Sequence, residues 1–315
     1  MDTKKIVGML ASMVLILGLL CGCVNQHPQQ TGTESEVQDI GKINEGRIAK
    51  EEQGERIISG SVALCEIFDR LEIELTGVPM TKLGQMPQRY ANTPMIGMPM
   101  NPDMEIIVSL QPTIIYAPDS LSDWLKSGYE KSGMKHSFVD LRSVDGLYRT
   151  IHMLATTYAK TEQEASLLEE KRDFEEQLAD ELAGKEKKKV LILMGLPGSY
   201  VAATPNSYVG SLVQMAGGEN VVQAEEQEEF RQINTEALLQ MDPDVILRTA
   251  HAMPEQVQEM FRKEFAENDI WKHFRAVEEQ QVYDLPPDSC GMSARFNYRD
   301  GVTAIVQSLY PQGEK

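Results

Sequence analysis

The sequence has few cysteines and an excess of acidic over basic residues. Only four of its 315 residues are cysteines, and none forms a Cys-x-x-Cys pair, which argues against a structural zinc site and against a disulfide scaffold. Lysine and arginine number 30 and the acidic residues 48, so the formal net charge is −18. A chain of this charge is poorly suited to binding nucleic acid or an anionic membrane surface.

Motifs for nucleotide binding and for catalysis are missing as well. The glycines after the apolar run at residues 190–194 form no Gly-x-Gly-x-x-Gly pattern and no loop ending in Gly-Lys-Ser or Gly-Lys-Thr, so nucleotide binding is poorly supported. Carboxylates are scattered along the chain, without the paired acid and base that a metal- or haem-handling enzyme such as a chelatase requires. The sequence therefore favours a binding protein over an enzyme.

The first 23 residues have the composition of a targeting segment. Lys4 and Lys5 precede a hydrophobic run at residues 6–20, which has the length of a signal-peptide core and is short for a membrane span. The run ends in Leu-Cys-Gly-Cys, which resembles a bacterial lipoprotein signal and implies that Cys23 carries a lipid anchor. An ordinary secretory signal and a transmembrane helix are the alternatives. We expect the polar residues 24–55 to form a flexible tether.

Two stretches far apart in the chain repeat one pattern. Residues 105–117 (EIIVSLQPTIIYA) and 236–249 (EALLQMDPDVILRT) each begin with a glutamate, reach a proline in a turn and continue into an apolar run. Each pattern predicts a helix, a tight turn and a strand, so we expect two similar α/β lobes. In the first lobe we also expect a strand at residues 73–78 and a helix at residues 120–132 with Trp124 facing inward.

The second apolar run leads directly to a histidine. Residues 245–247 predict a short buried strand, and His251 follows in the loop at its C-terminal end. Ligands of open α/β sheets bind at that end of the strands. A neutral imidazole is a good ligand for a transition metal, so His251 is a candidate ligand.

Residues 79–103 are rich in both proline and methionine. Five prolines hold this segment in extended and turn conformations, and five methionines, Met98 and Met100 among them, are spread along it. Methionine often fills irregular gaps in a core, which is one interpretation of the segment. The other is that a thioether serves as a ligand beside an apolar wall for a flat hydrophobic molecule.

Between the lobes the sequence predicts one long helix. After Gly146, residues 147–182 contain neither glycine nor proline, and apolar residues recur at helical spacing. Such a helix would make a stiff linker. We therefore expect an N-terminal lobe at residues 56–145, a linker helix at 146–187 and a C-terminal lobe at 188–315, with a ligand cleft between the lobes.

Two cysteines remain once the targeting segment is set aside. Cys65 and Cys290 could pair outside the cytoplasm or be two buried thiols. We expect them to be unpaired.

An ordered set of short motifs resembles one known family. GMPMNPDME, VLILMGLPGSY, LVQMAGGENV, DPDVILRTAHAMP and NDIWKHFRAVEEQQVYDL occur in this order, and the resemblance runs over residues 56–285. It is to the haem-binding lipoproteins of Gram-positive haem-uptake ABC transporters, a class III-like group of substrate-binding proteins. It implies two α/β lobes joined by one long rigid helix, with haem carried in the cleft between them and no reaction catalysed.

The resemblance also implies roles for particular residues. Met100 of the first lobe and His251 of the second would be the axial ligands of the haem iron. Met98 is an alternative ligand, because residues two apart in an extended segment point the same way. Glu105 and Glu236 would dock on arginines of the ABC transporter permease; without the resemblance, each is an ordinary solvated glutamate in the first turn of a helix.

The same resemblance places the protein at the membrane. It implies a receptor held by the lipid on Cys23 at the extracytoplasmic face of the cell membrane, which takes haem from upstream cell-surface haem-binding proteins. A siderophore- or cobalamin-binding receptor of the same fold is the alternative. It would need aromatic or basic residues in the cleft, and no methionine–histidine pair.

Overall fold

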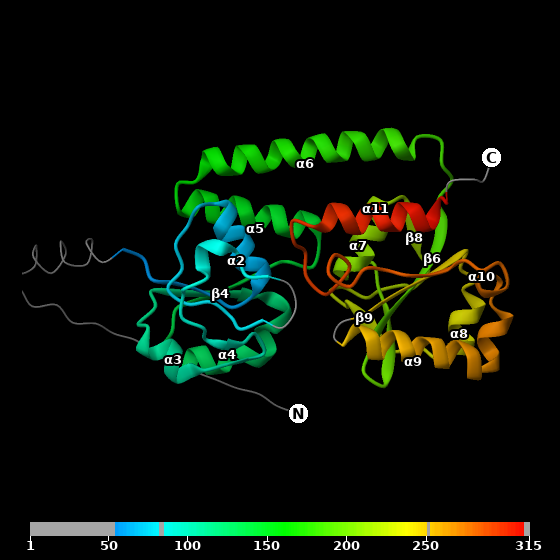
Figure 1. The fold of residues 1–315 in the computed structure, drawn as a ribbon, viewed down its shortest axis with the longest axis horizontal. Coiled ribbons are helices and arrows are strands. Elements are labelled where there is room, and N and C mark those ends of the chain that lie inside the picture. Colours follow the sequence, from blue (N-terminus) through cyan, green and yellow to red (C-terminus); the bar gives the residue numbers. More distant parts are fainter. Residues whose placement is uncertain (1–53, 82–84, 251–252, 312–315) are drawn as a thin grey trace, which may run out of the picture. The chain divides into compact units, whose positions relative to one another are not determined.

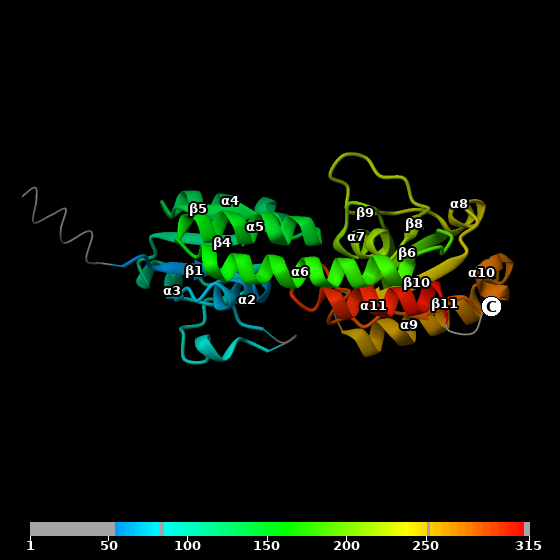
Figure 2. The same cartoon turned by 90° about the horizontal axis from the view of Figure 1, so that it is seen from above.

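The first sheet is built from three parallel strands in the order β1-β4-β5. These are β1 (Ile57–Ser59), β4 (Ile114–Pro118) and β5 (His136–Val139), paired in the register Ile57↔Ile114 and Ile115↔His136. All five residues of the central strand β4 are buried, as in a parallel sheet covered on both faces. Figures 1 and 2 show the computed structural model, which describes residues 54–81, 85–250 and 253–311.

Helices cover both faces of this sheet. Helices α2 (Val62–Arg70) and α5 (Val144–Thr157) share a buried cluster with Ile57 and Ile114, whereas α3 (Met104–Ser109) and α4 (Ser122–Lys131) share another with Ile58 and Ile115. Because side chains alternate along a strand, neighbouring isoleucines serve opposite faces. Figure 1 shows α2 and α5 on one side of β4 and α3 and α4 on the other.

The second sheet has six strands in the order β11-β10-β6-β7-β9, and β8 also pairs with β6. Strands β6 (Lys188–Leu196), β10 (Val245–Ala250) and β11 (Val282–Asp284) are parallel, and β7 (Ser199–Ala203) runs antiparallel to β6. Short strands β8 (Gly218–Asn220) and β9 (Phe230–Arg231) complete it.

This sheet is also a two-sided layer. Helices α7 (Tyr208–Met215) and α11 (Tyr298–Leu309) pack with Val190 and Ile192 on one face. The other face, with Leu191 and Ile246, is covered by the remaining elements of the lobe. They are α8 (Thr235–Gln240), α9 (Pro254–Glu267), η3 (Asp269–His273) and α10 (Arg275–Glu278). The predicted α/β architecture with two lobes is confirmed.

The prediction of a single linker helix is wrong, because the structure has two helices in this region. Helix α5 ends at Thr157 and α6 (Thr161–Leu182) begins four residues later, beside α5 and α11 in Figures 1 and 2. Between them Ala159 has φ +54°, and Lys160 N donates to Ala155 O over 2.8 Å. This is the hydrogen bond of a Schellman helix end, whose left-handed residue is usually glycine. The sequence has alanine there, so it carries no visible stop.

Two local expectations were also wrong. Residues 73–78 form no strand; Ile73, Leu75 and Val78 are buried but Glu74 is exposed, and the segment makes only isolated bridges, Ile58↔Gly77 and Val78↔Met95. On α4, Leu125 and Tyr129 face the core but Trp124 is exposed. Leu125 and Tyr129 are one turn apart and share a face, whereas Trp124 is rotated away from them by the helical step.

Two further features of the structure concern the pairing of the cysteines and the presence of membrane-spanning helices. Cys65 and Cys290 are both buried and free, as expected. Within the part of the chain that the structure describes, no helix is long and apolar enough to cross a membrane. The predicted targeting segment with Cys23, nearly all of the predicted tether, and His251 lie outside the described residues.

Candidate functional site

Met98 and Met100 lie on a tight β-hairpin of the first lobe. Strands β2 (Gly97–Met98) and β3 (Asn101–Pro102) pair Gly97 with Pro102 and Met98 with Asn101, so Pro99 and Met100 form the turn. The expectation that the two methionines lie on one extended segment is therefore wrong. Met98 projects from a strand and Met100 from the turn that follows it.

The base of this hairpin is fixed to the core. Ile96 is buried, its N–H donates to Val78 O over 2.9 Å, and its carbonyl accepts from Asp103 N over 2.7 Å. Gly97 has φ +91°, and a Cβ there would lie 3.0 Å from Asp103 N, so the sharp bend needs glycine. A rigid base therefore holds the tip that carries Met100.

Four methionines are exposed on or next to this hairpin. Met98 is 39% exposed and Met100 54%, and Met80 and Met95 are also exposed. The four belong to neighbouring segments, since Met80 N donates to Gly97 O over 2.7 Å and Met95 bridges to Val78. We call Met80, Met95, Met98 and Met100 the thioether surface. Large apolar side chains exposed together are typical of a binding surface, and thioethers are ligands for haem iron.

In the second lobe, the strand before His251 forms as predicted. Strand β10 ends at Ala250, and Pro254, preceded by Met253, is the first residue of α9. Met253 is exposed and has φ +50°, so the chain turns sharply before the helix. His251 and Ala252 lie outside the described residues, so the pairing of Met100 with His251 stays a prediction.

The other histidines in the described region have local contacts. His136 Nδ1 lies 3.0 Å from Met134 O, and His152 Nδ1 lies 2.7 Å from Glu164 Oε1. His273 is exposed at the end of η3. Among the described residues, no group of three or more histidine, cysteine, aspartate or glutamate side chains is placed to hold a metal ion.

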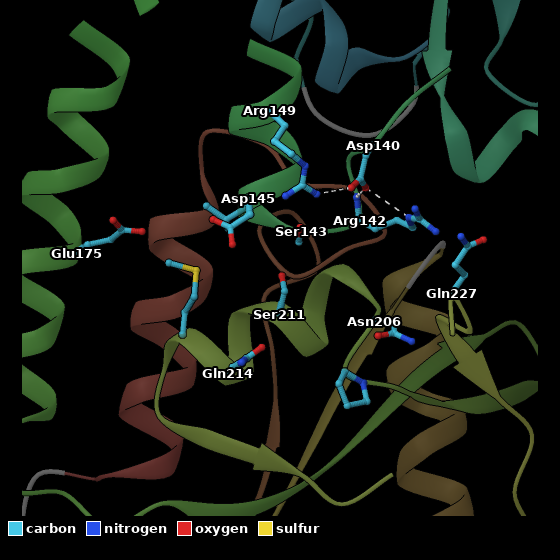
Figure 3. A pocket seen from close by; sticks show the side chains of 13 residues that line it. Asp140, Arg142, Ser143, Asp145, Arg149, Glu175, Asn206, Ser211, Gln214 and Gln227 are labelled. Carbon is cyan, nitrogen blue, oxygen red and sulfur yellow. Dashed lines mark hydrogen bonds and ion pairs between the residues drawn. The ribbon is translucent and has the colours of Figure 1, made fainter. Parts of the chain in front are cut away.

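A polar cavity of about 560 Å³ was not foreseen from the sequence. It lies between the start of α5 and the loop and helix at residues 205–215, and neither Met98 nor Met100 lines it (Figure 3). On its wall, Asp140 is 2.7 Å from Arg149 Nη2 and 3.4 Å from Arg142 Nε, and Arg142 also reaches Asp119 over 2.9 Å. Burial alone would raise the pKa of Asp140, but hydrogen bonds from Arg142 and Arg149 hold it below its usual value. These charges satisfy one another, so the cavity suits a polar guest better than a flat apolar one.

The two mirrored glutamates occupy equivalent positions. Glu105 is the second residue of α3 and Glu236 the second of α8, and both are exposed. The caps also correspond, because Asp103 accepts from Glu105 N over 3.0 Å and Asn234 accepts from Ala237 N over 2.8 Å. The local repeat is confirmed, and the docking role of the two glutamates stays a prediction.

These features together define a class of protein. Two α/β lobes, one with a parallel sheet and one with a mixed sheet, are connected through α6, and an exposed ligand-type side chain lies on a rigid hairpin; this is the architecture of a two-lobed solute-binding protein. Residues 57–289 match the family model described as periplasmic binding protein, and the chain belongs to that family.

Relatives and solved structures narrow the comparison. The chain is 39% identical over 257 residues to the high-affinity heme uptake system protein IsdE of Staphylococcus aureus (strain Newman), an alignment covering 81% of this chain and 87% of that protein. The fold of this chain is similar to that of an ABC transporter substrate-binding protein from Listeria monocytogenes EGD-e. The TM-score is 0.77, with 39% identity over 81% of this chain and 98% of the other. S. aureus IsdE complexed with heme gives a TM-score of 0.76 and 38% identity at the same coverage.

Proposed function

We propose that the protein is a haem receptor that passes haem to an ABC importer and catalyses no reaction. The observation that carries this proposal is the similarity to S. aureus IsdE, whose structure complexed with heme matches this chain over 98% of its own length. The thioether surface supports it independently, because it presents soft ligands and an apolar wall on a rigid hairpin.

In this proposal Met100 and His251 bind the iron from opposite lobes. Met100 stands at the tip of the hairpin and is more exposed than Met98, which favours it as the ligand. Thioether and imidazole would fill both axial positions, which suits a carrier because no open coordination site remains for oxygen chemistry. Each ligand alone contributes part of the affinity, so loss of one bond weakens haem binding and makes release reversible and stepwise.

An absorbance titration with haemin tests this assignment. Residues 24–315 should take up haemin in a saturable manner and show a low-spin, six-coordinate spectrum. In Met100→Ala and His251→Ala that spectrum should be lost and haemin should bind about tenfold or more weakly, equivalent to about 1.4 kcal/mol. Leu168→Ala is the control, since Leu168 is an apolar side chain on α6 that is 45% exposed and lies outside the thioether surface, and it should leave the spectrum unchanged.

The possible results test the haem-receptor function and the choice of methionine ligand separately. If Met98→Ala rather than Met100→Ala abolished the spectrum, the haem receptor would stand with Met98 as its ligand. If the parent protein took up no haemin, the proposal would be wrong, and a siderophore or cobalamin would be the next ligand to titrate.

We also propose that Glu105 and Glu236 dock on the permease. Their support is their equivalent exposed positions in two mirrored helices. In a reconstituted importer, Glu105→Ala and Glu236→Ala should each reduce receptor-stimulated ATP hydrolysis while leaving haemin binding intact. Glu255→Ala is the control, because Glu255 is an exposed glutamate in the first turn of α9. Equal effects of all three substitutions would contradict specific docking.

A lipid on Cys23 would hold the receptor at the extracytoplasmic face of the cell membrane, within reach of cell-surface haem-binding proteins that supply haem. The support is the Leu-Cys-Gly-Cys ending of the hydrophobic run. Cells fed a labelled fatty acid should incorporate the label into the parent chain and not into Cys23→Ser. Incorporation into both would place the lipid elsewhere.

A further inference from the structure

The chain connects the two lobes a second time, after α6. Residues 286–297, which we call the strap, follow β11 in the second lobe and reach the first lobe before α11 begins. Ala294 N donates to Leu141 O over 2.8 Å, and both residues are buried. Figures 1 and 2 show this orange-to-red segment extending toward α2.

In the second lobe the strap is bonded to the strand that leads to His251. Thr249, near the end of β10, donates its hydroxyl to Cys290 O over 2.8 Å, and both residues are buried. Tyr208 of α7 donates its hydroxyl to Ser289 O over 3.1 Å. These hydrogen bonds therefore couple the end of β10 and the start of α7 to the strap.

In the first lobe, Arg295 of the strap forms an ion pair with Glu66 in which the guanidinium contacts both carboxylate oxygens. Arg295 Nε lies 3.1 and 3.2 Å from the two carboxylate oxygens of Glu66 on α2, and its Nη2 also donates to Glu66. The side chains are only 21% and 20% exposed. A guanidinium that meets a carboxylate at two points fixes both distance and direction. Removing either partner would leave a poorly solvated charge.

Neighbouring contacts tie the same region to α6. Glu170 of α6 pairs with Arg70 of α2 over 2.5 Å and with Arg299 of α11 over 3.2 Å. The Tyr298 ring, directly after the strap, packs edge-on against Phe174 of α6 with ring centroids 5.6 Å apart. The strap and α6 thus form two separate connections, and two connections resist rotation that a single helix would allow.

We propose that the strap holds the two lobes at a fixed spacing, with Arg295 as a positioning residue acting on Glu66, and that this spacing governs how fast the bound ligand leaves. For haem as that ligand, the inference rests on the proposed function. The proposal that the strap fixes the lobe spacing does not depend on the identity of the ligand, so the spacing is tested on the ligand-free protein.

The first experiment measures the lobe spacing without ligand. Spin labels at Lys126→Cys on α4 and Gln258→Cys on α9, both exposed positions, report the distance between the lobes, while the native Cys65 and Cys290 are fully buried. The distribution should be narrow in the parent and broader in Glu66→Gln and in Arg295→Lys, which keeps the charge but loses the two-point geometry. Unchanged distributions in both variants would overturn the proposal.

The second experiment measures haemin release to an excess of an apo-globin acceptor. Glu66→Gln and Arg295→Lys should release haemin about fivefold or more faster, with the low-spin spectrum of the bound form unchanged. The exchanged pair Glu66→Arg with Arg295→Glu should restore slow release, which a general loss of stability would not. Arg262→Gln is the control, because the Arg262–Glu259 pair on α9 is exposed and lies within one helix.

The two proposals fail in different ways. A parent that binds no haemin but shows label distances that broaden in Glu66→Gln would refute the haem receptor and keep the strap. A parent that binds haemin, with release rates identical in Glu66→Gln and Arg262→Gln, would refute the positioning role of Arg295 and keep the haem receptor.

Discussion

Burial determines the chemistry of the two described cysteines. Cys65 lies in the core of α2, and burial raises the pKa of its thiol to about 12. Burial likewise raises the pKa of the Cys290 thiol in the strap to about 12. The thiolate is the reactive form of cysteine, so both side chains should be inert while the protein is folded.

We expect residues 24–315 to show no rapid reaction with a thiol reagent at pH 8, and both Cys65 and Cys290 to react once the chain is unfolded in denaturant. The physical reason is the combination of low accessibility and raised thiol pKa. A colorimetric disulfide reagent measures it. Fast labelling of one native cysteine would show that its surroundings open.

Glu229 is a half-buried carboxyl close to other acids. Its pKa is raised to about 7, mainly by burial; Arg142 opposes this increase, and the nearby Asp119 and Asp140 add to it. Its Oε2 atom is buried without a hydrogen-bond partner. A carboxyl whose pKa is higher in the folded state stabilises the fold below its unfolded value of 4.5, and that contribution is lost as the pH rises through 7.

Glu229→Gln should therefore leave the free energy of unfolding nearly unchanged at pH 4.5 and raise it at pH 8, by about 1 kcal/mol after allowance for partial exposure. Denaturant unfolding at the two pH values measures this difference. Glu226→Gln is the control, because Glu226 is an exposed neighbour. A gain of equal size at both pH values would point to a cause other than the charge.

At the level of elements, helix ends and turns decide which residues face a ligand. Ala159 occupies a left-handed conformation between α5 and α6, which costs a residue with a Cβ about 1–2 kcal/mol. The absence of glycine there explains why the break between the helices could not be predicted. The hairpin that carries Met98 and Met100 could not be predicted either, because its two-residue turn depends on strand pairing between Gly97 and Pro102.

Replacing Ala159 by glycine should stabilise the protein. Relief of the left-handed strain should raise the free energy of unfolding by about 1 kcal/mol and Tm by about 2–4 °C. Ala183→Gly is a matched control, because Ala183 is exposed at the end of α6 with φ −58°, and it should give no gain. A gain in both variants, measured by calorimetry, would mean that the strain at Ala159 is not the cause.

At the level of the whole molecule, α6 and the strap together restrict the lobes. Solution scattering of residues 24–315 should give the same radius of gyration with and without haemin, within experimental error. The physical reason is that rotation of either lobe would break the Arg295–Glu66 pair and the Ala294–Leu141 hydrogen bond. A clear compaction on binding haemin would contradict this expectation.

The sequence alone determined the two-lobed α/β architecture, the strand before His251 and the mirrored helices of Glu105 and Glu236. Those features follow from local periodicity, caps and turn residues, which act over a few positions. Only the tertiary structure decided the hairpin geometry of Met98 and Met100, the break at Ala159 and the Arg295–Glu66 pair. These depend on strand pairing, on backbone strain relieved by packing and on charges 229 positions apart, none of which leaves a local pattern.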